Sequence, residues 1–142
     1  MRIMGLDFGS KTIGVALSDP FGWTAQGLEI VRREQEENLK SSMKRLEEII
    51  KQYGVEKIVL GYPKNMNNTE GPRCEKTLQF KEKLEKRFNL EVILCDERMS
   101  TIAAQRTLLE ADISRNKRKN VIDKMAAVYI LQGYLDRKDK TN

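Results

Sequence analysis

Carboxylates at the ends of apolar segments are the side chains of this chain whose type and spacing could do chemistry. Asp7 stands in an apolar run at residues 3–8 that is typical of a strand, and residues 9–12 after it are typical of a tight turn. A carboxylate held rigidly beside backbone N–H groups could hold a metal ion or face a phosphate. The simpler interpretation is that Asp7 caps the turn through a hydrogen bond to the backbone.

Two further acidic positions follow later in the chain. Asp96 and Glu97 come directly after a short apolar run at residues 90–95, and Asp123 lies on the apolar, core-directed face of a C-terminal helix. An acid on such a face is costly to bury unless it is paired or binds a cation. Structural explanations are also available, because Arg98 could pair with the strand-end acids and the helix dipole favours an acid in the first turn.

Together these acids would coordinate Mg²⁺ or Mn²⁺ through oxygen and leave positions for water and phosphate. Two such ions can activate a water on one side of a phosphodiester and stabilise the leaving oxygen on the other. The chain has no His, and Cys74 and Cys95 lack C-x-x-C spacing. A zinc site and a Cys–His or Ser–His catalytic pair are therefore not expected.

Basic residues are the second group that could take part. The net charge of +5 favours a polyanionic partner. Phosphate contacts are expected from basic side chains near the acids, namely Lys11, Arg98, Arg115, Lys117, Arg118 and Lys119. The last four form a loop just before the C-terminal helix, and such a loop can also be simply solvated.

The elements that must position these residues follow from hydrophobic periodicity. Strands are expected at residues 3–8, 13–17 and 24–31 as an antiparallel meander, then at 57–62 and 90–95 as parallel strands. Helices are expected at residues 35–53, ending at Gly54, and at residues 73–88.

Composition bounds the class of protein. The 142 residues, 39% hydrophobic and 33% charged, fit one soluble α/β domain. Apolar runs are too short to cross a bilayer and no signal-peptide pattern begins the chain, so a cytoplasmic protein without a membrane partner is expected.

Four blocks of sequence resemble the signature blocks of one family. They are DFGSKTIGVA at residues 7–16, GYP at 61–63, DERMST at 96–101 and DKMAA at 123–127. They resemble the YqgF family, also called RuvX, whose members are described as pre-16S rRNA nucleases and Holliday junction resolvases. The resemblance covers essentially the whole chain and implies one ribonuclease-H-like domain over residues 1–142, with a five-stranded mixed sheet flanked by helices.

The resemblance also implies a catalytic and metal-binding set of Asp7, Glu97 and Asp123. Resolvases of the RuvC type carry an acid after the fourth strand, where this chain has Gly61-Tyr62-Pro63. The second carboxylate would then come from the next strand, as Asp96 or Glu97, and both remain candidate metal ligands.

The expected function is that of a metal-dependent nuclease that uses Mg²⁺ or Mn²⁺ to process the 5′ end of pre-16S ribosomal RNA. The alternatives are a Holliday junction resolvase acting on branched DNA and a non-catalytic RNA- or ribosome-binding module. The first hairpin also resembles the phosphate loop of actin-like ATPases, but those need two such domains. Expected partners are structured RNA and ribosomal particles. The protein is expected to be a monomer or weak dimer, since no apolar patch can be assigned to an interface.

Overall fold

A five-stranded mixed sheet organises the protein in the computed structural model, which describes residues 2–9, 11–36, 38–62, 72–96 and 125–137. Residues 125–137 are helical. The other elements, in chain order, are β1 (Arg2–Phe8), β2 (Thr12–Ser18), β3 (Ala25–Arg32), α1 (Lys40–Tyr53), β4 (Val55–Tyr62), α2 (Pro72–Phe88) and β5 (Glu91–Asp96).

The strand order places β1 in the middle of the sheet. The order is β3-β2-β1-β4-β5, in which the pairs β1–β2 and β2–β3 are antiparallel. The pairs β1–β4 and β4–β5 are parallel, as the helices between those strands require. The predicted arrangement of three antiparallel strands followed by two parallel ones is confirmed.

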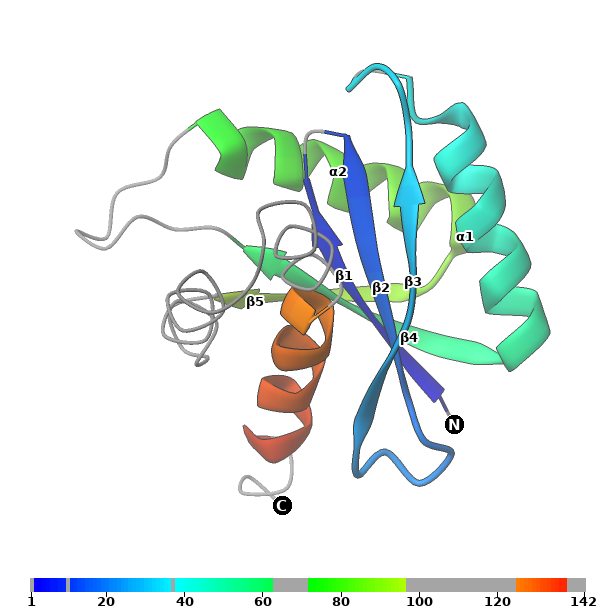
Figure 1. Cartoon of the computed structure of the whole chain (residues 1–142), viewed down its shortest axis with the longest axis vertical. Helices are drawn as coiled ribbons and strands as arrows, with labels where there is room; N and C mark the ends of the chain where they lie inside the picture. The colour runs from blue at the N-terminus through cyan, green and yellow to red at the C-terminus, as the bar shows by residue number, and fades with distance from the viewer. Residues whose placement is uncertain (1, 10, 37, 63–71, 97–124, 138–142) are drawn as a thin grey trace, which may run out of the picture.

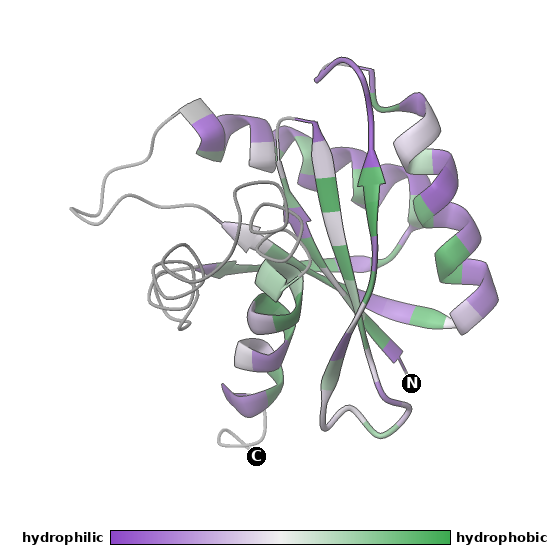
Figure 2. Ribbon diagram, viewed as in Figure 1, coloured by the Kyte–Doolittle hydropathy of each residue, from purple (hydrophilic) through white to green (hydrophobic). Residues whose placement is uncertain are grey.

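Helices cover both faces of this sheet (Figure 1). The α1 and α2 helices lie over one face, and the helical residues 125–137 lie over the other. Alternate residues of β1 point to opposite faces, so Met4 and Leu6 join the cluster under α1 and α2. Ile3 joins the second cluster, with Ala127 and Leu131. Figure 2 shows that α1 carries polar residues on its outer side. The central strand is therefore buried on both faces, as its apolar sequence predicted.

The predicted start of the first helix is wrong by five residues. It was expected at residue 35, whereas α1 begins at Lys40 and its N-cap position is Leu39. Arg33 explains the difference, because its Nε atom donates a hydrogen bond to the carbonyl of Glu36 at 3.1 Å. This contact holds residues 33–36 in a bend. It also occupies the Glu36 carbonyl, which would accept a backbone hydrogen bond in a helix. The end of α1 is as predicted, with Gly54 in the left-handed conformation at φ 65°.

The turn between β2 and β3 is built around Asp19. Its carboxylate accepts hydrogen bonds from the backbone N–H groups of Trp23 and Thr24 at 2.7 and 2.8 Å. The Thr24 N–H bond is the largest of the contacts that lower the pKa of Asp19. Because Thr24 belongs to this turn, β3 begins at Ala25 rather than at residue 24. Among the described residues no helix is long and apolar enough to span a membrane.

Candidate active site

Asp7 lies near the end of the central strand, at the edge where the parallel strands β1, β4 and β5 have their carboxyl ends. Phe8, rather than Asp7, is the last residue of β1. The side chain of Asp7 is half-buried, and its partner on β2 is Gly14. On the other side Leu6 pairs with Leu60, and Gly61 follows. Gly14 and Gly61 thus flank Asp7 at an edge where open α/β sheets bind ligands.

The helical residues 125–137 cover the face of β1 to which Asp7 belongs. Strand alternation puts Asp7 on the same face as Ile3 and Gly5. A Cβ atom added at Gly5 would lie 2.7 Å from the Leu131 Cβ atom and 3.2 Å from the Ala127 carbonyl oxygen. The helix therefore packs directly on the strand two residues before Asp7. The small, buried side chains of Ala126 and Ala127, which are 1% and 0% exposed, allow this close approach.

Asp96 ends β5 at the same edge of the sheet but on the other face. It pairs with Tyr62 and is half-buried. By alternation it shares its face with Val92, which packs in the cluster under α1 and α2. Cys95, one residue earlier, faces the helical residues 125–137 and donates its S–H to the Ile130 carbonyl at 3.8 Å. Two strand spacings, about 10 Å, separate β1 from β5, so Asp7 and Asp96 share an edge without sharing a face.

The other predicted acids and most of the predicted basic residues lie outside the described residues. These are Glu97, Arg98, Arg115, Lys117, Arg118, Lys119 and Asp123. Lys11 is described and is exposed in the turn that follows Asp7. Within the part of the chain that the structure describes, no group of three His, Cys, Asp or Glu residues could hold a metal ion.

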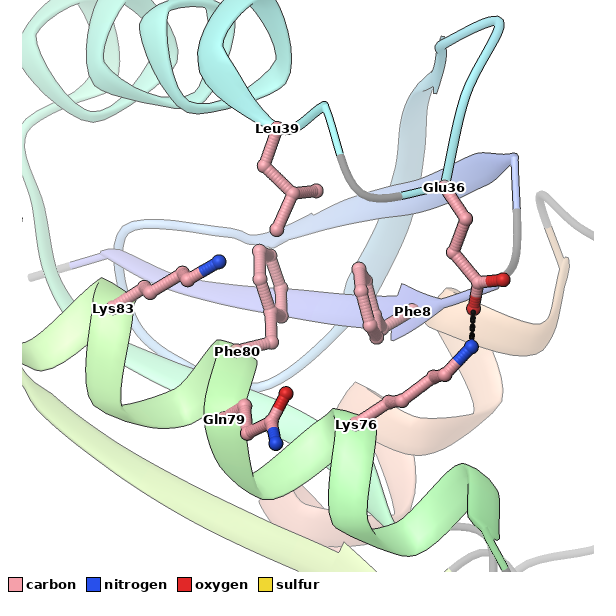
Figure 3. A pocket seen from close by; sticks show the side chains of 7 residues that line it. All are labelled: Phe8, Glu36, Leu39, Lys76, Gln79, Phe80 and Lys83. Carbon is pink, nitrogen blue, oxygen red and sulfur yellow. Dashed lines mark ion pairs between the residues drawn. The ribbon is translucent and has the colours of Figure 1, made fainter.

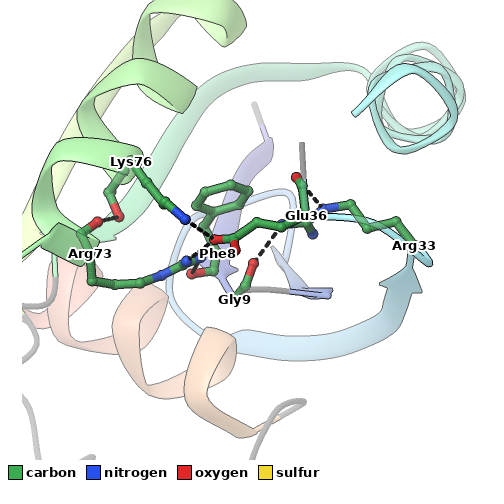
Figure 4. A network of polar contacts seen from close by, with 7 residues as sticks. Phe8, Gly9, Arg33, Glu36, Arg73 and Lys76 are labelled. Atoms are coloured by element: carbon green, nitrogen blue, oxygen red, sulfur yellow. Dashed lines mark hydrogen bonds and ion pairs between the residues drawn. The ribbon is translucent and has the colours of Figure 1, made fainter. Parts of the chain in front are cut away.

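Two arginines that the sequence analysis did not identify hold the turn after Asp7 in place (Figure 4). Arg73 on α2 donates from Nη2 to the Phe8 carbonyl at 3.0 Å, and Arg33 donates from Nη2 to the Gly9 carbonyl at 2.7 Å. The turn also closes on itself, because the Gly9 N–H donates to the Thr12 carbonyl at 2.7 Å. Hydrogen bonds from charged groups are stronger than neutral ones. The backbone beside Asp7 is therefore fixed from two directions.

The same arginines pack on the aromatic ring of Phe8, the last residue before the turn. Each guanidinium carbon lies 4.9 Å from the centre of the Phe8 ring, which is within the range of cation–π attraction. The Phe8 ring stacks on Phe80 of α2 with 4.1 Å between ring centres. Aromatic packing and guanidinium contacts thus anchor the end of β1 to α2.

Glu36 is the acid that neutralises part of this positive charge. Its carboxylate pairs with Arg73 and, at 3.0 Å, with Lys76. The hydrogen bond from Lys76, followed by that from Arg73, lowers the pKa of Glu36 below its ordinary value of 4.5. Arg33, Arg73 and Lys76 against Glu36 leave a surplus of positive charge around the turn. Such a surplus favours a phosphate next to Asp7.

Sequence comparison relates the chain to one family over almost its full length. Residues 1–137 match the family model described as "RuvX: Holliday junction resolvase". A relative from Agathobacter rectalis is 60% identical over 136 residues, which are 96% of this chain and 95% of the relative. A relative from Bacillus cereus strain AH187 is 59% identical over 138 residues, which are 97% of this chain and 100% of the relative. Both relatives are named "Putative pre-16S rRNA nuclease".

Structural comparison identifies the fold. The structure of T. thermophilus RuvC in complex with a Holliday junction substrate matches with a TM-score of 0.59 and 13% identity. The match covers 99% of this chain and 97% of that chain. The fowlpox virus Holliday junction resolvase matches with a TM-score of 0.52 and 18% identity, over 100% of both chains. The predicted ribonuclease-H-like fold is thereby confirmed.

Proposed function

The chain belongs to the RuvX family, and from this membership and the geometry around Asp7 we propose that the protein is a metal-dependent nuclease. Its relatives at about 60% identity are named as nucleases. The observation that carries the proposal is Asp7 itself, a half-buried carboxylate at the carboxyl edge of the central strand. Two arginines fix the backbone that follows it, at the carbonyls of Phe8 and Gly9.

A divalent metal fits the donor set at this position. Carboxylate oxygens are the ligands that Mg²⁺ and Mn²⁺ prefer, and Asp7 supplies them at the carboxyl edge of the sheet. We propose that Asp7, Glu97 and Asp123 hold Mg²⁺ or Mn²⁺. When bound, such an ion would polarise the phosphate and make a water more acidic.

The second ligand is better supplied by Glu97 than by Asp96. Asp96 belongs to the sheet face under α1 and α2, whereas Asp7 belongs to the opposite face. Side chains of a strand alternate between its two faces, so the residue that follows Asp96 is the one expected on the face of Asp7. That residue is Glu97. For the third ligand, Asp123 precedes Ala127 by one helical turn, a spacing that places two residues on one helix face.

The residues around the turn would bind and orient the phosphodiester. Arg33 and Arg73 position the backbone after Asp7 through the carbonyls of Gly9 and Phe8. Lys11 is exposed on the same turn and could contact a phosphate directly. A carboxylate fixed before the substrate arrives needs no rearrangement during the reaction, and such preorganisation is a large part of enzymatic rate enhancement.

The favoured substrate is the 5′ region of pre-16S ribosomal RNA, free or within ribosomal particles, because relatives about 60% identical to this chain are named as pre-16S rRNA nucleases. Such an enzyme would work in the cytoplasm, as a monomer or weak dimer. The family description supports a second candidate, cleavage of branched DNA at a Holliday junction.

Side-by-side cleavage assays separate these candidates. Purified protein with Mn²⁺ would be given a pre-16S RNA fragment, a single-stranded RNA of unrelated sequence and a four-way DNA junction. We expect cleavage near the 5′ end of the precursor at a higher rate than of either other substrate. Symmetric resolution of the junction with an uncut precursor would instead establish the second candidate, and absence of cleavage of all three would refute the nuclease.

A further inference from the structure

A basic groove lies on the side of the protein formed by α1 and α2, away from the face of Asp7. It is open, has a volume of about 560 Å³ and runs between the start of α1 and the second half of α2. We call it the α1–α2 groove, and its lining residues are Asn38, Leu39, Lys40, Met43, Lys83, Lys86 and Arg87. Four of these residues are cations, and none of the described lining residues is acidic.

Most of this positive charge is not neutralised by the protein. Lys40, Lys83 and Lys86 are exposed, and none of them makes an ion pair with another described residue. Arg87 alone has a partner, at 3.1 Å from a Glu47 carboxylate oxygen. Outside the groove, Lys51 and Lys81 each pair with a glutamate one turn away, whereas the exposed Lys44 of α1 has no ion pair with a described residue. The groove therefore gathers three cations that lack a counterion among the described residues.

The floor of the groove is apolar and one of its ends is the start of a helix. Met43 is 6% exposed, and the half-buried Leu39 lies beside it. Leu39 provides no side-chain cap for α1, and the first turn carries no acid. Positive groups around an apolar floor suit a ligand that carries phosphates next to sugars or bases, and the positive end of the α1 dipole adds to this preference.

A second cavity continues the groove toward the catalytic edge (Figure 3). It has a volume of about 130 Å³ and shares Leu39 and Lys83 with the groove. At its other end lie Lys76 and Phe8, and Phe8 directly follows Asp7. The path from Lys76 to Arg87 follows about 16 Å of α2, at 1.5 Å per residue. Basic side chains follow this path to the far end of α2, and the one acid among the described lining residues is Glu36, the partner of Lys76.

We propose that the α1–α2 groove binds the phosphodiester backbone of a nucleic-acid strand that continues past the catalytic edge. The proposal rests on the nuclease function proposed above and extends it by a binding surface outside the active site. Lys83, Lys86, Lys40 and Arg87 contact phosphates, while Leu39 and Met43 contact sugars or bases. The groove contributes to affinity for long substrates and takes no part in bond cleavage.

The test compares two double variants that remove the same charge. Lys83→Ala/Lys86→Ala empties the groove of two unpaired cations, and the control Lys51→Ala/Lys81→Ala removes two paired lysines from the same helices. Binding of a fluorescein-labelled single-stranded RNA of twenty nucleotides would be measured by anisotropy in EDTA between 50 and 200 mM KCl. For single strands each lost phosphate contact reduces the salt slope by about 0.7, or roughly fivefold in affinity at 0.1 M salt.

The groove variant is therefore expected to bind about 25-fold more weakly at 0.1 M salt, with a slope lower by about 1.4. The control should change affinity by less than about threefold, since neither Lys51 nor Lys81 lines the groove and each is paired with a glutamate. Equal weakening of both variants would overturn the proposal. Tighter binding of a polyglutamate peptide than of the RNA, lost in the groove variant alone, would also overturn it and assign the groove to an acidic protein partner.

Cleavage kinetics distinguish this proposal from the nuclease function. On a long RNA with Mn²⁺, the groove variant should raise KM and leave kcat unchanged, whereas a loss of kcat would contradict a pure binding role. Failure of the wild-type protein to cleave any substrate, together with groove-dependent binding, would refute the nuclease and support the groove. Normal cleavage together with RNA binding that does not depend on the groove residues would support the nuclease and refute the groove.

Discussion

Substitution of Gly5 by alanine should displace the helix at residues 125–137 from the sheet face to which Asp7 belongs. The new Cβ atom would lie 2.7 Å from the Leu131 Cβ atom and 3.2 Å from the Ala127 carbonyl oxygen. Both atoms belong to the helix backbone or are fixed to it, so no side-chain rotation can relieve the contact. Ordinary carbon–carbon contacts are about 3.5–4.0 Å, so the helix must move by about 1 Å.

This displacement should affect activity more than stability. Overpacking of a core costs about 1–3 kcal/mol, and the reduced freedom of the unfolded chain returns up to about 1 kcal/mol. We expect Gly5→Ala to lower the free energy of unfolding by about 1–2 kcal/mol, measured by urea denaturation. A misplacement of about 1 Å in a catalytic site can cost on the order of 10²-fold in rate, and we expect that loss in Mn²⁺-dependent RNA cleavage.

Leu131→Ala is the matched control, because it keeps the Cβ atom that lies against Gly5 and removes the rest of the side chain without pushing the helix away. Loss of this fully buried side chain should cost about 2–5 kcal/mol of stability, more than Gly5→Ala does. At a temperature where both variants are folded, Leu131→Ala should nevertheless retain more activity. Wild-type activity in Gly5→Ala, or an equal loss in both variants, would refute the argument that the close contact at Gly5 positions the site.

Three further predictions test the turn, its acid and the choice of metal ligand. Arg73→Met should lower the free energy of unfolding by about 1–3 kcal/mol, because it removes a charged hydrogen bond to the turn, and should also reduce the cleavage rate; an unchanged rate would contradict a positioning role. The pKa of Glu36 is lowered in the folded protein, so its contribution to stability is complete above pH 4.5 and is lost as the pH falls through the folded-state value. In acid titrations followed by circular dichroism, Glu36→Gln should therefore make the fall of the free energy of unfolding below pH 4.5 less steep. Glu82→Gln, at an exposed position of α2, is the control and should leave this pH dependence as in the wild-type protein. Glu97→Gln should abolish Mn²⁺-dependent cleavage while Asp96→Asn retains most of it, and the reverse pattern would show that strand alternation does not choose the ligand.

The order of the elements could be predicted because it depends on local patterns. Strand alternation, the helical period of α1 and α2, and the glycine that ends α1 are all contained within short windows of sequence. Asp7 could be singled out in the same way, as an acid within an apolar strand. Leu78 shows the limit of such patterns, since this apolar residue of α2 is 40% exposed.

The arginines around the turn could not be predicted, because their contacts join distant parts of the chain. Arg73 reaches the Phe8 carbonyl across 65 residues of sequence, and Arg33 reaches the Gly9 carbonyl across 24. In the sequence, Arg73 is only a charged residue at the start of a predicted helix, and Arg33 is only a charged residue that follows a predicted strand. The contact of Gly5 with the helix at residues 125–137 is equally long-range. The sheet face to which Asp96 belongs is different, because it could have been predicted from the sequence by counting alternate residues from Val92.

Cleavage by Asp7→Asn tests the central claim most directly, namely that the carboxylate on the central strand is the catalytic metal ligand. The substitution preserves the shape of the side chain and removes its charge. Single-turnover cleavage of a pre-16S RNA fragment would be measured over a range of Mn²⁺ concentrations, together with urea stability and RNA binding in EDTA. We predict a rate lower by on the order of 10²-fold or more, with folding and binding retained. A rate close to that of the wild-type protein at every Mn²⁺ concentration would contradict the claim.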